Sequence, residues 1–410
     1  MFEEYKGFKK EIYVVVLAKM IASMGSFIYP VLTLILSTKL GMDATHIAVY
    51  TFLSILVIEP FNFVGGKLAD TLSKRNIIIT CNLIAFFLFF VGAIMPISLA
   101  HILVYGMATI FLTIASASYD ALLIDLSTFK NVESVFSLEY LASNVGTALT
   151  PLIASLLFDN YLNLAFFLNS VALFINCILL IKYVKDETLS DRIQTEYQKS
   201  LDHKINPIKL IFRNKALLLF LIFTIFEHIA VDQYSYLMPL QLQSIYGDEY
   251  TNIYALASFL EILVIAGITG YITIIFKDAR NLKKLSISSV LILVSFIIFA
   301  IGANSVYGIY LSVTLFTISE IFATISYIPY LSKRVPGNYF SRIHTIITSI
   351  ASYVWVVVEM IEGKIIDGFG YGWAWVFVIG LCLFKELSLH FLEEKDKKVY
   401  KTFYKEEENA

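Results

Sequence analysis

The sequence has little charge, and it lacks the motifs that mark most enzymes. Asp, Glu, Lys and Arg make up 16% of its 410 residues, against about 25% in a typical soluble domain. Its net charge of −2 excludes the basic balance of a nucleic-acid-binding protein. The absence of a G-x-x-x-x-G-K-[ST] loop excludes ATP-driven transport by this chain. Without a metal-ligand spacing or a nucleophile–base arrangement, we expect neither an enzyme nor a cofactor or metal.

Cysteine is also scarce. The three cysteines, Cys81, Cys177 and Cys382, each lie inside an apolar run, which favours buried hydrophobes over a disulfide framework. The N-terminal segment MFEEYKGFKKEIY is mixed in charge, and the apolar block after it is too long for a signal peptide. We therefore expect the chain to enter the membrane by its own helices.

The sequence is rich in hydrophobic residues, which form long apolar segments. Hydrophobic residues make up 58% of the chain, and its mean hydropathy is +0.74. The apolar residues form blocks of roughly 20, the length of a helix that crosses a bilayer. We predict twelve spans, at 10–36, 44–68, 76–96, 101–124, 136–158, 163–184, 215–243, 250–275, 283–303, 307–331, 341–366 and 372–393.

Lys and Arg orient these spans, because cytoplasmic loops of membrane proteins are enriched in both. With the N-terminus in the cytoplasm, 27 of the 31 basic residues fall in segments on that side. The longest such segment is a charged linker, 185–214. We predict an all-α integral membrane protein with both termini cytoplasmic, in which six-helix bundles at 1–184 and 215–395 precede a polar tail at 396–410.

The turn after the second span carries the most specific motif, GKLADTLSKR at 66–75. This turn and the six-plus-six arrangement resemble the major facilitator superfamily, whose pattern there is close to G-x-L-A-D-R-x-G-R-K. Gly66, Asp70, Lys74 and Arg75 match, whereas the Arg and the second Gly of the pattern are replaced. The resemblance implies a conformational latch between the halves, in which glycine allows close approach and Asp70 sits at a helix N-terminus.

Two weaker motifs resemble the drug:proton antiporters of that superfamily. Their fifth span has a glycine-rich run ending G-P-x-x-G-G. Gly146 and Pro151 match this run, and small residues that still allow helix packing replace the other glycines. In TLFTISEIF, Glu320 stands where some multidrug antiporters carry a membrane-embedded Glu. These motifs imply a proton-coupled exporter.

Ionisable residues inside the spans are the main candidates for a site. A charge at the bilayer centre costs about 2.5–3.5 kcal/mol, so these groups should face water or each other. A carboxyl group removed from water holds its proton more tightly, and we assign proton coupling to Glu320, Glu227, Asp232 and Glu261. Charged, amide and aromatic side chains near them are assigned to substrate binding: Lys19, Glu59, Asp120, Gln233, Tyr234 and Tyr236.

Structural alternatives stay open for several of these residues. Glu227 can instead pair with His228 or Lys19, Glu320 can pair with a buried base, and Lys19 can be a counter-ion. Lys385 is expected to extend to the inner membrane interface. Glu359 and Glu362 lie near the outer end of their span. They can equally well face a solvated vestibule as take part in a site.

We expect a secondary active transporter of the cytoplasmic membrane that exports lipophilic or cationic small molecules in exchange for protons, by alternating access. Its expected partners are a small-molecule substrate, protons and the lipid bilayer, with the protein a monomer. A dedicated exporter of a cell-made metabolite, such as a siderophore or peptide, is the first alternative. Because the acids outnumber Lys19, an anionic substrate is disfavoured. A non-transporting scaffold or sensor is the second alternative.

Overall fold

The computed structural model describes most of the chain as helices, with no strand among the described residues. It divides into two compact units, one of residues 5–193 with 337–345, the other of 1–4, 194–336 and 346–410. We call them the N-terminal unit and the C-terminal unit. The described residues are 5–26, 35–42, 44–96, 98–128, 130–148, 161–185 and 206–400, with residues 28, 32, 150, 153, 154 and 157.

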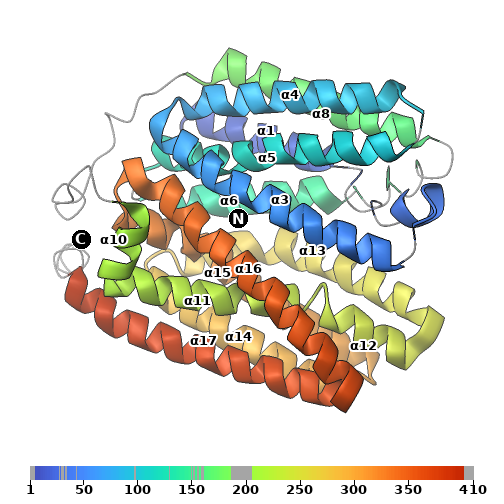
Figure 1. The fold of residues 1–410 in the computed structure, drawn as a ribbon. Helices are drawn as coiled ribbons and strands as arrows, with labels where there is room; N and C mark the ends of the chain where they lie inside the picture. Colours follow the sequence, from blue (N-terminus) through green and yellow to red (C-terminus); the bar gives the residue numbers. More distant parts are fainter. Residues whose placement is uncertain are drawn as a thin grey trace. The chain divides into compact units, whose positions relative to one another are not determined.

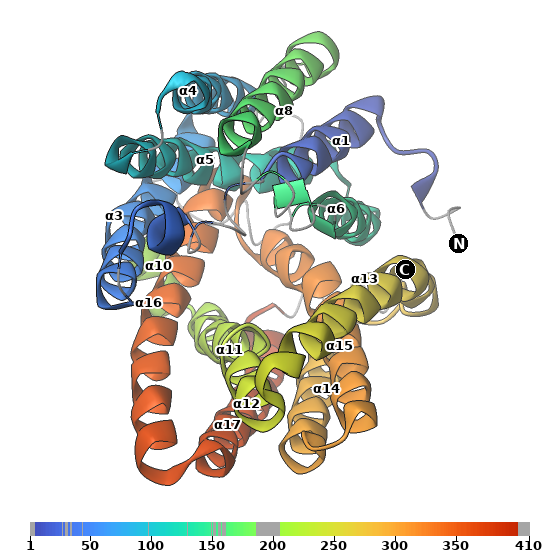
Figure 2. The same ribbon diagram turned by 90° about the vertical axis from the view of Figure 1, so that its right-hand side faces the viewer.

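The N-terminal unit is a bundle in which α4 lies beside α5 and α8, and α1 lies beside α6 and α8 (Figures 1 and 2). Phe89 of α4 and Phe166 of α8 are buried together in its core, with ring centroids 6.1 Å apart. The unit contains α1 (Lys10–Met24), the π-helical turn η3 (Ile35–Lys39), α3 (Ala44–Thr71), α4 (Lys74–Ile94), α5 (Leu99–Leu126), α6 (Val132–Ala148) and α8 (Leu162–Tyr183).

The C-terminal unit pairs α14 with α15 and α11 with α17 (Figure 2). Asn214 begins α11, and its side chain accepts hydrogen bonds from Ala216 N and Leu217 N, which satisfies two otherwise free donors. The unit contains α10 (Pro207–Arg213), α11 (Lys215–Asp232), α12 (Leu237–Tyr246), the 3₁₀ turn η5 (Gly247–Glu249), α13 (Tyr250–Ile275), α14 (Asn281–Gly302), α15 (Val306–Arg334), most of α16 (Gly337–Phe369) and α17 (Tyr371–Val399).

Small polar residues bring α14 and α15 together. Ser295 and Ser312 each donate to the other's carbonyl oxygen at 2.9 Å, and the hydroxyls of Ser288 and Ser319 lie 3.1 Å apart. All four side chains are buried. Small residues let membrane helices approach closely, and hydroxyl bonds between helices stabilise the contact where no water competes.

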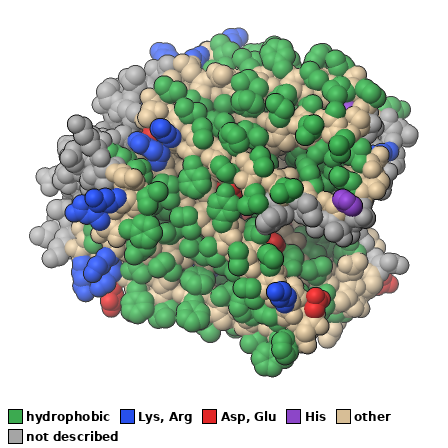
Figure 3. All heavy atoms as spheres, viewed as in Figure 1, with side chains coloured by type: hydrophobic (Ala, Val, Ile, Leu, Met, Phe, Trp, Pro, Cys, Tyr) green, Lys and Arg blue, Asp and Glu red, His purple; other side chains and the backbone are tan. Residues whose placement is uncertain are grey.

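The outer surface is apolar. Hydrophobic side chains cover most of the face seen in Figure 3, and large ones such as Ile301 and Tyr307 are almost fully exposed. In the part of the chain that is described, nine helices are long and apolar enough to cross a membrane. The other three predicted spans, 10–36, 44–68 and 136–158, include residues that the structure does not describe in full. An apolar surface of this extent requires a lipid environment.

Candidate functional site

The N-terminal unit contains an ionic cluster of one base and two acids. The ammonium of Lys19 on α1 lies 3.0 Å from Asp120 of α5 and 2.7 Å from Glu139 of α6. Ser143, one turn after Glu139, donates its hydroxyl hydrogen to that carboxylate at 2.8 Å. The predicted residues Lys19 and Asp120 are thus in contact, and with both carboxylates ionised the cluster keeps a net negative charge.

Glu139 is missing from the prediction, although it completes this cluster. It lies three residues after the start of the predicted span 136–158. The signal that could have identified it is the pattern Glu139-x-x-x-Ser143, which places an acid and a hydroxyl on one helix face. In the structure Glu139 is 8% exposed.

Glycine lets α6 approach α1 at this level. A Cβ atom added to Gly146 would lie 2.6 Å from the carbonyl oxygen of Met20, one residue beyond Lys19. Gly146 is therefore placed as expected for a helix-packing residue. Thr150 continues the contact, because its hydroxyl donates to Ser23 O at 3.4 Å. Pro151, the other predicted packing residue, lies outside the described residues.

The predicted latch motif lies against the first turns of α16. The Asp70 carboxylate accepts hydrogen bonds from the backbone N–H groups of Ser341 and Arg342, both at 3.0 Å, and from Arg342 Nε at 2.9 Å. Gly66 is packed so closely that an added Cβ would overlap the hydroxyl of Thr345. An acid near a helix N-terminus is favoured by the helix dipole, and the Arg342 side chain adds a charge-assisted bond.

The basic pair of the motif contacts two other helices of the same unit. Lys74 forms a 2.7 Å ion pair with Asp125 near the end of α5. Arg75 donates to the carbonyl oxygens of Leu180 and Ile181, at 3.2 and 3.0 Å. These carbonyls belong to the last turn of α8, where cations are stabilised. The motif therefore joins α4, α5 and α8 at one end of the unit.

In the C-terminal unit, the predicted span 215–243 is broken in the middle. The helix α11 ends at Asp232 and α12 begins at Leu237, with turns between them. Pro239 explains the break, because its ring would clash with the carbonyl of residue 235 in a continuous helix. Met238 N instead donates to Gln233 O at 3.0 Å. Broken helices of this kind supply many transporter binding sites.

Polar groups of α16 meet α11 at this break. Gln233 donates through Nε2 to Glu362 Oε1 at 3.2 Å, and both side chains are 0% exposed. Glu359, one turn before, is half-buried and within electrostatic reach of Asp232. Asp232 also lies 4.0 Å from His228. The vestibule interpretation is therefore wrong for Glu362, which is buried rather than solvated.

The same unit contains a buried ion pair that joins α11 to α17. Lys385 donates through Nζ to Glu227 Oε2 at 2.7 Å. The Lys385 side chain is 0% exposed and that of Glu227 is 10% exposed. The prediction that Lys385 extends to the membrane interface is wrong, since a buried carboxylate on the neighbouring helix holds it inside. Glu227 thus pairs with Lys385, and not with His228 or Lys19, the partners considered from the sequence.

The two predicted tyrosines at the break have different surroundings. Tyr234 is buried, stacks on Phe316 at 4.9 Å between ring centroids, and its hydroxyl approaches the half-buried Glu261 of α13. Tyr236 points the other way, toward α16, where its hydroxyl donates to Glu359 O at 3.4 Å. Glu261 and Tyr234 are thus brought together, as are Tyr236 and the acids of α16.

Two further predicted acids lie on α15 and α3. Glu320 is half-buried on α15, one residue after Ser319 at the α14 contact. Glu59 lies on α3 directly before Pro60, and its Oε2 atom is buried without a hydrogen-bond partner among the described residues.

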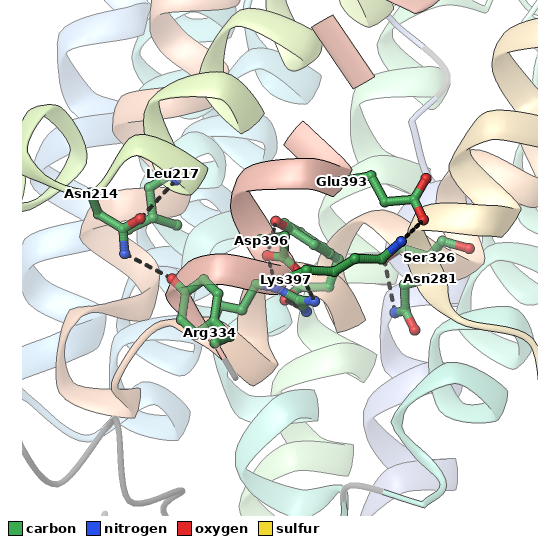
Figure 4. Close-up of polar contacts among 10 residues, drawn as sticks. Asn214, Leu217, Asn281, Ser326, Arg334, Glu393, Asp396 and Lys397 are labelled. Carbon is green, nitrogen blue, oxygen red and sulfur yellow. Dashed lines mark hydrogen bonds and ion pairs between the residues drawn. The ribbon is translucent and has the colours of Figure 1, made fainter. Parts of the chain in front are cut away.

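At the end of the C-terminal unit lies a polar network that the sequence analysis missed. Arg334 of α15 forms a two-pronged ion pair with the fully buried Asp396 of α17, through Nε at 2.6 Å and Nη2 at 2.5 Å. The Tyr330 hydroxyl donates to the same carboxylate at 2.8 Å. Nearby, Asn214 donates to the Tyr400 hydroxyl at 2.9 Å (Figure 4). This network fixes the ends of α11, α15 and α17 and is structural in character.

Comparison with known protein families shows to which family the chain belongs. The sequence profile of the Major Facilitator Superfamily matches residues 15–359. The chain belongs to the Major Facilitator Superfamily. Members of that family are transporters rather than enzymes, and they bind small-molecule substrates within a lipid bilayer. A comparison with curated proteins gave no match.

Solved structures of similar fold include two transporters. The human organic anion transporter MFSD10 (TETRAN) superposes with a TM-score of 0.73 at 12% identity, over 92% of this chain and 98% of that one. A bacterial homologue of the iron transporter ferroportin, in an outward-facing state, superposes with a TM-score of 0.72 at 13% identity, over 94% and 100%. At such low identity these similarities establish the fold alone.

Proposed function

We propose that the protein is a proton-coupled antiporter that exports lipophilic or cationic small molecules by alternating access. The observation that carries this proposal is that acids outnumber bases at two places, around Lys19 and at the break between α11 and α12. In the C-terminal unit, Asp232, Glu359 and Glu362 gather at a helix break. Cations, including protons, are the species that such a site favours.

The N-terminal unit supports the same conclusion. Two carboxylates contact Lys19, so acids outnumber bases in this cluster. A bound organic cation would compete with Lys19 for Asp120 and Glu139. We assign substrate binding to this cluster together with Glu59, and we assign proton coupling to Glu320, Glu227, Asp232 and Glu261.

Aromatic side chains suit the lipophilic part of such a substrate. The hydroxyls of Tyr234 and Tyr236 lie near carboxylates, and the half-buried ring of Tyr236 can attract an amphiphilic cation. Gln233 adds an amide within the same turn. We assign these three residues to substrate contact in the C-terminal unit.

The latch and the topology complete the proposal. The contact of Asp70 with Arg342 would form and break during each transport cycle, with Gly66, Lys74 and Arg75 holding the turn in place. We propose twelve spans in bundles 1–184 and 215–395, a linker at 185–214, a tail at 396–410 and both termini in the cytoplasm. The protein would act as a monomer in the cytoplasmic membrane.

The test is substrate-induced proton movement in liposomes that contain the purified protein and an internal pH dye. Lipophilic cations, zwitterionic metabolites and anions form the panel, and Glu320→Gln and Asp232→Gln are compared with wild type. Cations should move protons through the wild type, and the variants should lose this coupling. Proton movement by anions alone, or none with any member of the panel, would contradict the proposal.

A further inference from the structure

The carboxyl group of Glu362 and the amide of Gln233 form a pair that is joined by one hydrogen bond. Gln233 Nε2 donates to Glu362 Oε1 at 3.2 Å and to Ile229 O at 3.0 Å. The orientation of the amide is fixed by Ile229, because a carbonyl oxygen can only accept. Both side chains are 0% exposed, so water from the surface does not complete the pair.

The other two atoms of the pair are both acceptors without a donor. Glu362 Oε2 and Gln233 Oε1 are buried and have no hydrogen-bond partner in the described part of the chain. Leaving a buried acceptor unsatisfied costs about 1–3 kcal/mol, and more for a charged group. Two acceptors cannot satisfy each other. One proton on Glu362 Oε2 would supply a donor, and the amide oxygen of Gln233 is the acceptor of the same pair that lacks one.

We propose that Glu362 is a proton-binding site of the transporter and that Gln233 responds to its protonation. With the proton bound, carboxyl and amide form a ring of two hydrogen bonds, O–H to amide oxygen and N–H to carboxyl oxygen. With the proton released, one bond remains and the charge is exposed to its neighbours. This inference rests on the proposed function, and it adds a coupling acid to those assigned above.

The surrounding charges favour a proton at this position. On α16, Glu359 lies one turn away and Asp367 lies further toward the helix end. From α11, Asp232 acts on Glu359, and His228 lies against Asp232. The Tyr236 hydroxyl faces the same acids. A negative charge on Glu359 or Asp232 would oppose a further negative charge on Glu362.

A metal ion fits this site less well than a proton. Among the described residues no group of three or more His, Cys, Asp or Glu side chains converges in a way that could hold a metal. Glu362 and Gln233 are enclosed, and a proton is the cation that needs no additional volume. The acids therefore act as an electrostatic surrounding, not as ligands.

The position of the pair gives the proton a mechanical effect. Gln233 is the first residue after α11, at the break before α12, and Glu362 lies on α16. Proton binding would tie the broken helix to α16 through a second bond, and proton release would loosen this connection. Broken helices move during alternating access in many transporters, so the pair can couple protonation to that movement.

The first test is infrared spectroscopy of the purified protein during a pH titration, without substrate. Wild type should show protonated-carboxyl absorption, and Glu362→Gln should remove the part of this band that belongs to Glu362 and leave that of the other acids. Glu393→Gln, which removes an exposed acid of α17, should keep the band. The exchanged variant Gln233→Glu with Glu362→Gln rebuilds the acid–amide pair in reverse and should restore a band. Survival of the full band in Glu362→Gln would overturn the proposal, as would its absence from wild type.

The second test separates this inference from the proposed function. Glu362→Gln should lose at least tenfold in substrate-driven proton movement and keep exchange of labelled for unlabelled substrate, which needs no net proton transfer. The exchanged variant should regain proton movement. If wild type couples substrate to protons and Glu362→Gln couples equally well, the inference fails and the proposed function stands. If wild type moves no protons, the proposed function fails, while the infrared titration still decides whether Glu362 binds one.

Discussion

Removal of Lys385 should destabilise the C-terminal unit more than removal of any exposed charge. The Glu227 carboxylate accepts from Lys385 at 2.7 Å, and its other oxygen has no hydrogen-bond partner among the described residues. In Lys385→Met, the carboxylate would stay buried with neither oxygen paired. Breaking a buried ion pair by removing one partner costs about 3–5 kcal/mol.

Removing both charges should be much less costly. The double variant Lys385→Met with Glu227→Leu replaces the pair by apolar side chains of similar volume, a change that is often neutral or stabilising. The two substitutions should therefore be non-additive by about 3 kcal/mol or more, the sign of a direct interaction. Unfolding of each variant in mixed detergent micelles, followed by tryptophan fluorescence, measures this. All three tryptophans lie on α16 and α17, so the signal reports on this unit.

An exposed ion pair on the same helix provides the control. Glu393 and Lys397 lie 2.8 Å apart, each with a side chain that is 50% exposed. Such pairs contribute about 0–1 kcal/mol, so Glu393→Gln should leave unfolding almost unchanged. The reasoning would be refuted if Lys385→Met unfolded like wild type, or if the effects of the two substitutions at the buried pair simply added.

Close approach and charge at the latch and at the α1–α6 contact give three further predictions. Gly66→Ala places a methyl group 2.8 Å from the Ser341 carbonyl oxygen, and transport assayed in liposomes should fall severely because backbone must move. Asp70→Asn loses the charge-assisted bond to Arg342, worth about 1.5–3 kcal/mol, and should slow transport by about tenfold or more in the same assay. Gly146→Val forces α6 away from α1 and should lower the free energy of unfolding by about 1–3 kcal/mol.

A glycine with open space around it is the control for these substitutions. A Cβ atom added to Gly106 on α5 would meet no atom within 4 Å. Gly106→Ala should therefore leave both transport and unfolding unchanged. Equal effects at Gly106 and Gly66 would show that loss of glycine flexibility, not the loss of close approach, is responsible. Wild-type transport by Asp70→Asn would contradict the importance of its contact with α16.

The sequence predicted the class of fold, because the apolar helices that define it depend on local hydropathy. It did not predict which residues pair. Whether Glu227 meets Lys19, His228 or Lys385 depends on how each helix is rotated about its axis, and the partner lies 158 positions away. Lys385 was misplaced for the same reason, since extension to the interface is only the default for a lysine near a helix end.

The break between α11 and α12 could have been predicted from the sequence. Pro239 and the polar run DQYSY at 232–236 are both visible in the sequence, and together they predict an interruption of the span 215–243. The burial of Glu362 had no such signal, because it results from packing against Gln233, which lies at the break after α11. The sequence therefore did not show which side chains pair between the helices of one unit, and the structure was needed to identify these pairs.

The most direct test of the central claim is accumulation of a labelled lipophilic cation by liposomes that contain the protein, under an imposed pH gradient. The account predicts that liposomes with an acidic interior concentrate the cation, and that an ionophore that collapses the pH gradient abolishes the accumulation. Accumulation that is the same with and without the gradient would contradict proton-coupled antiport.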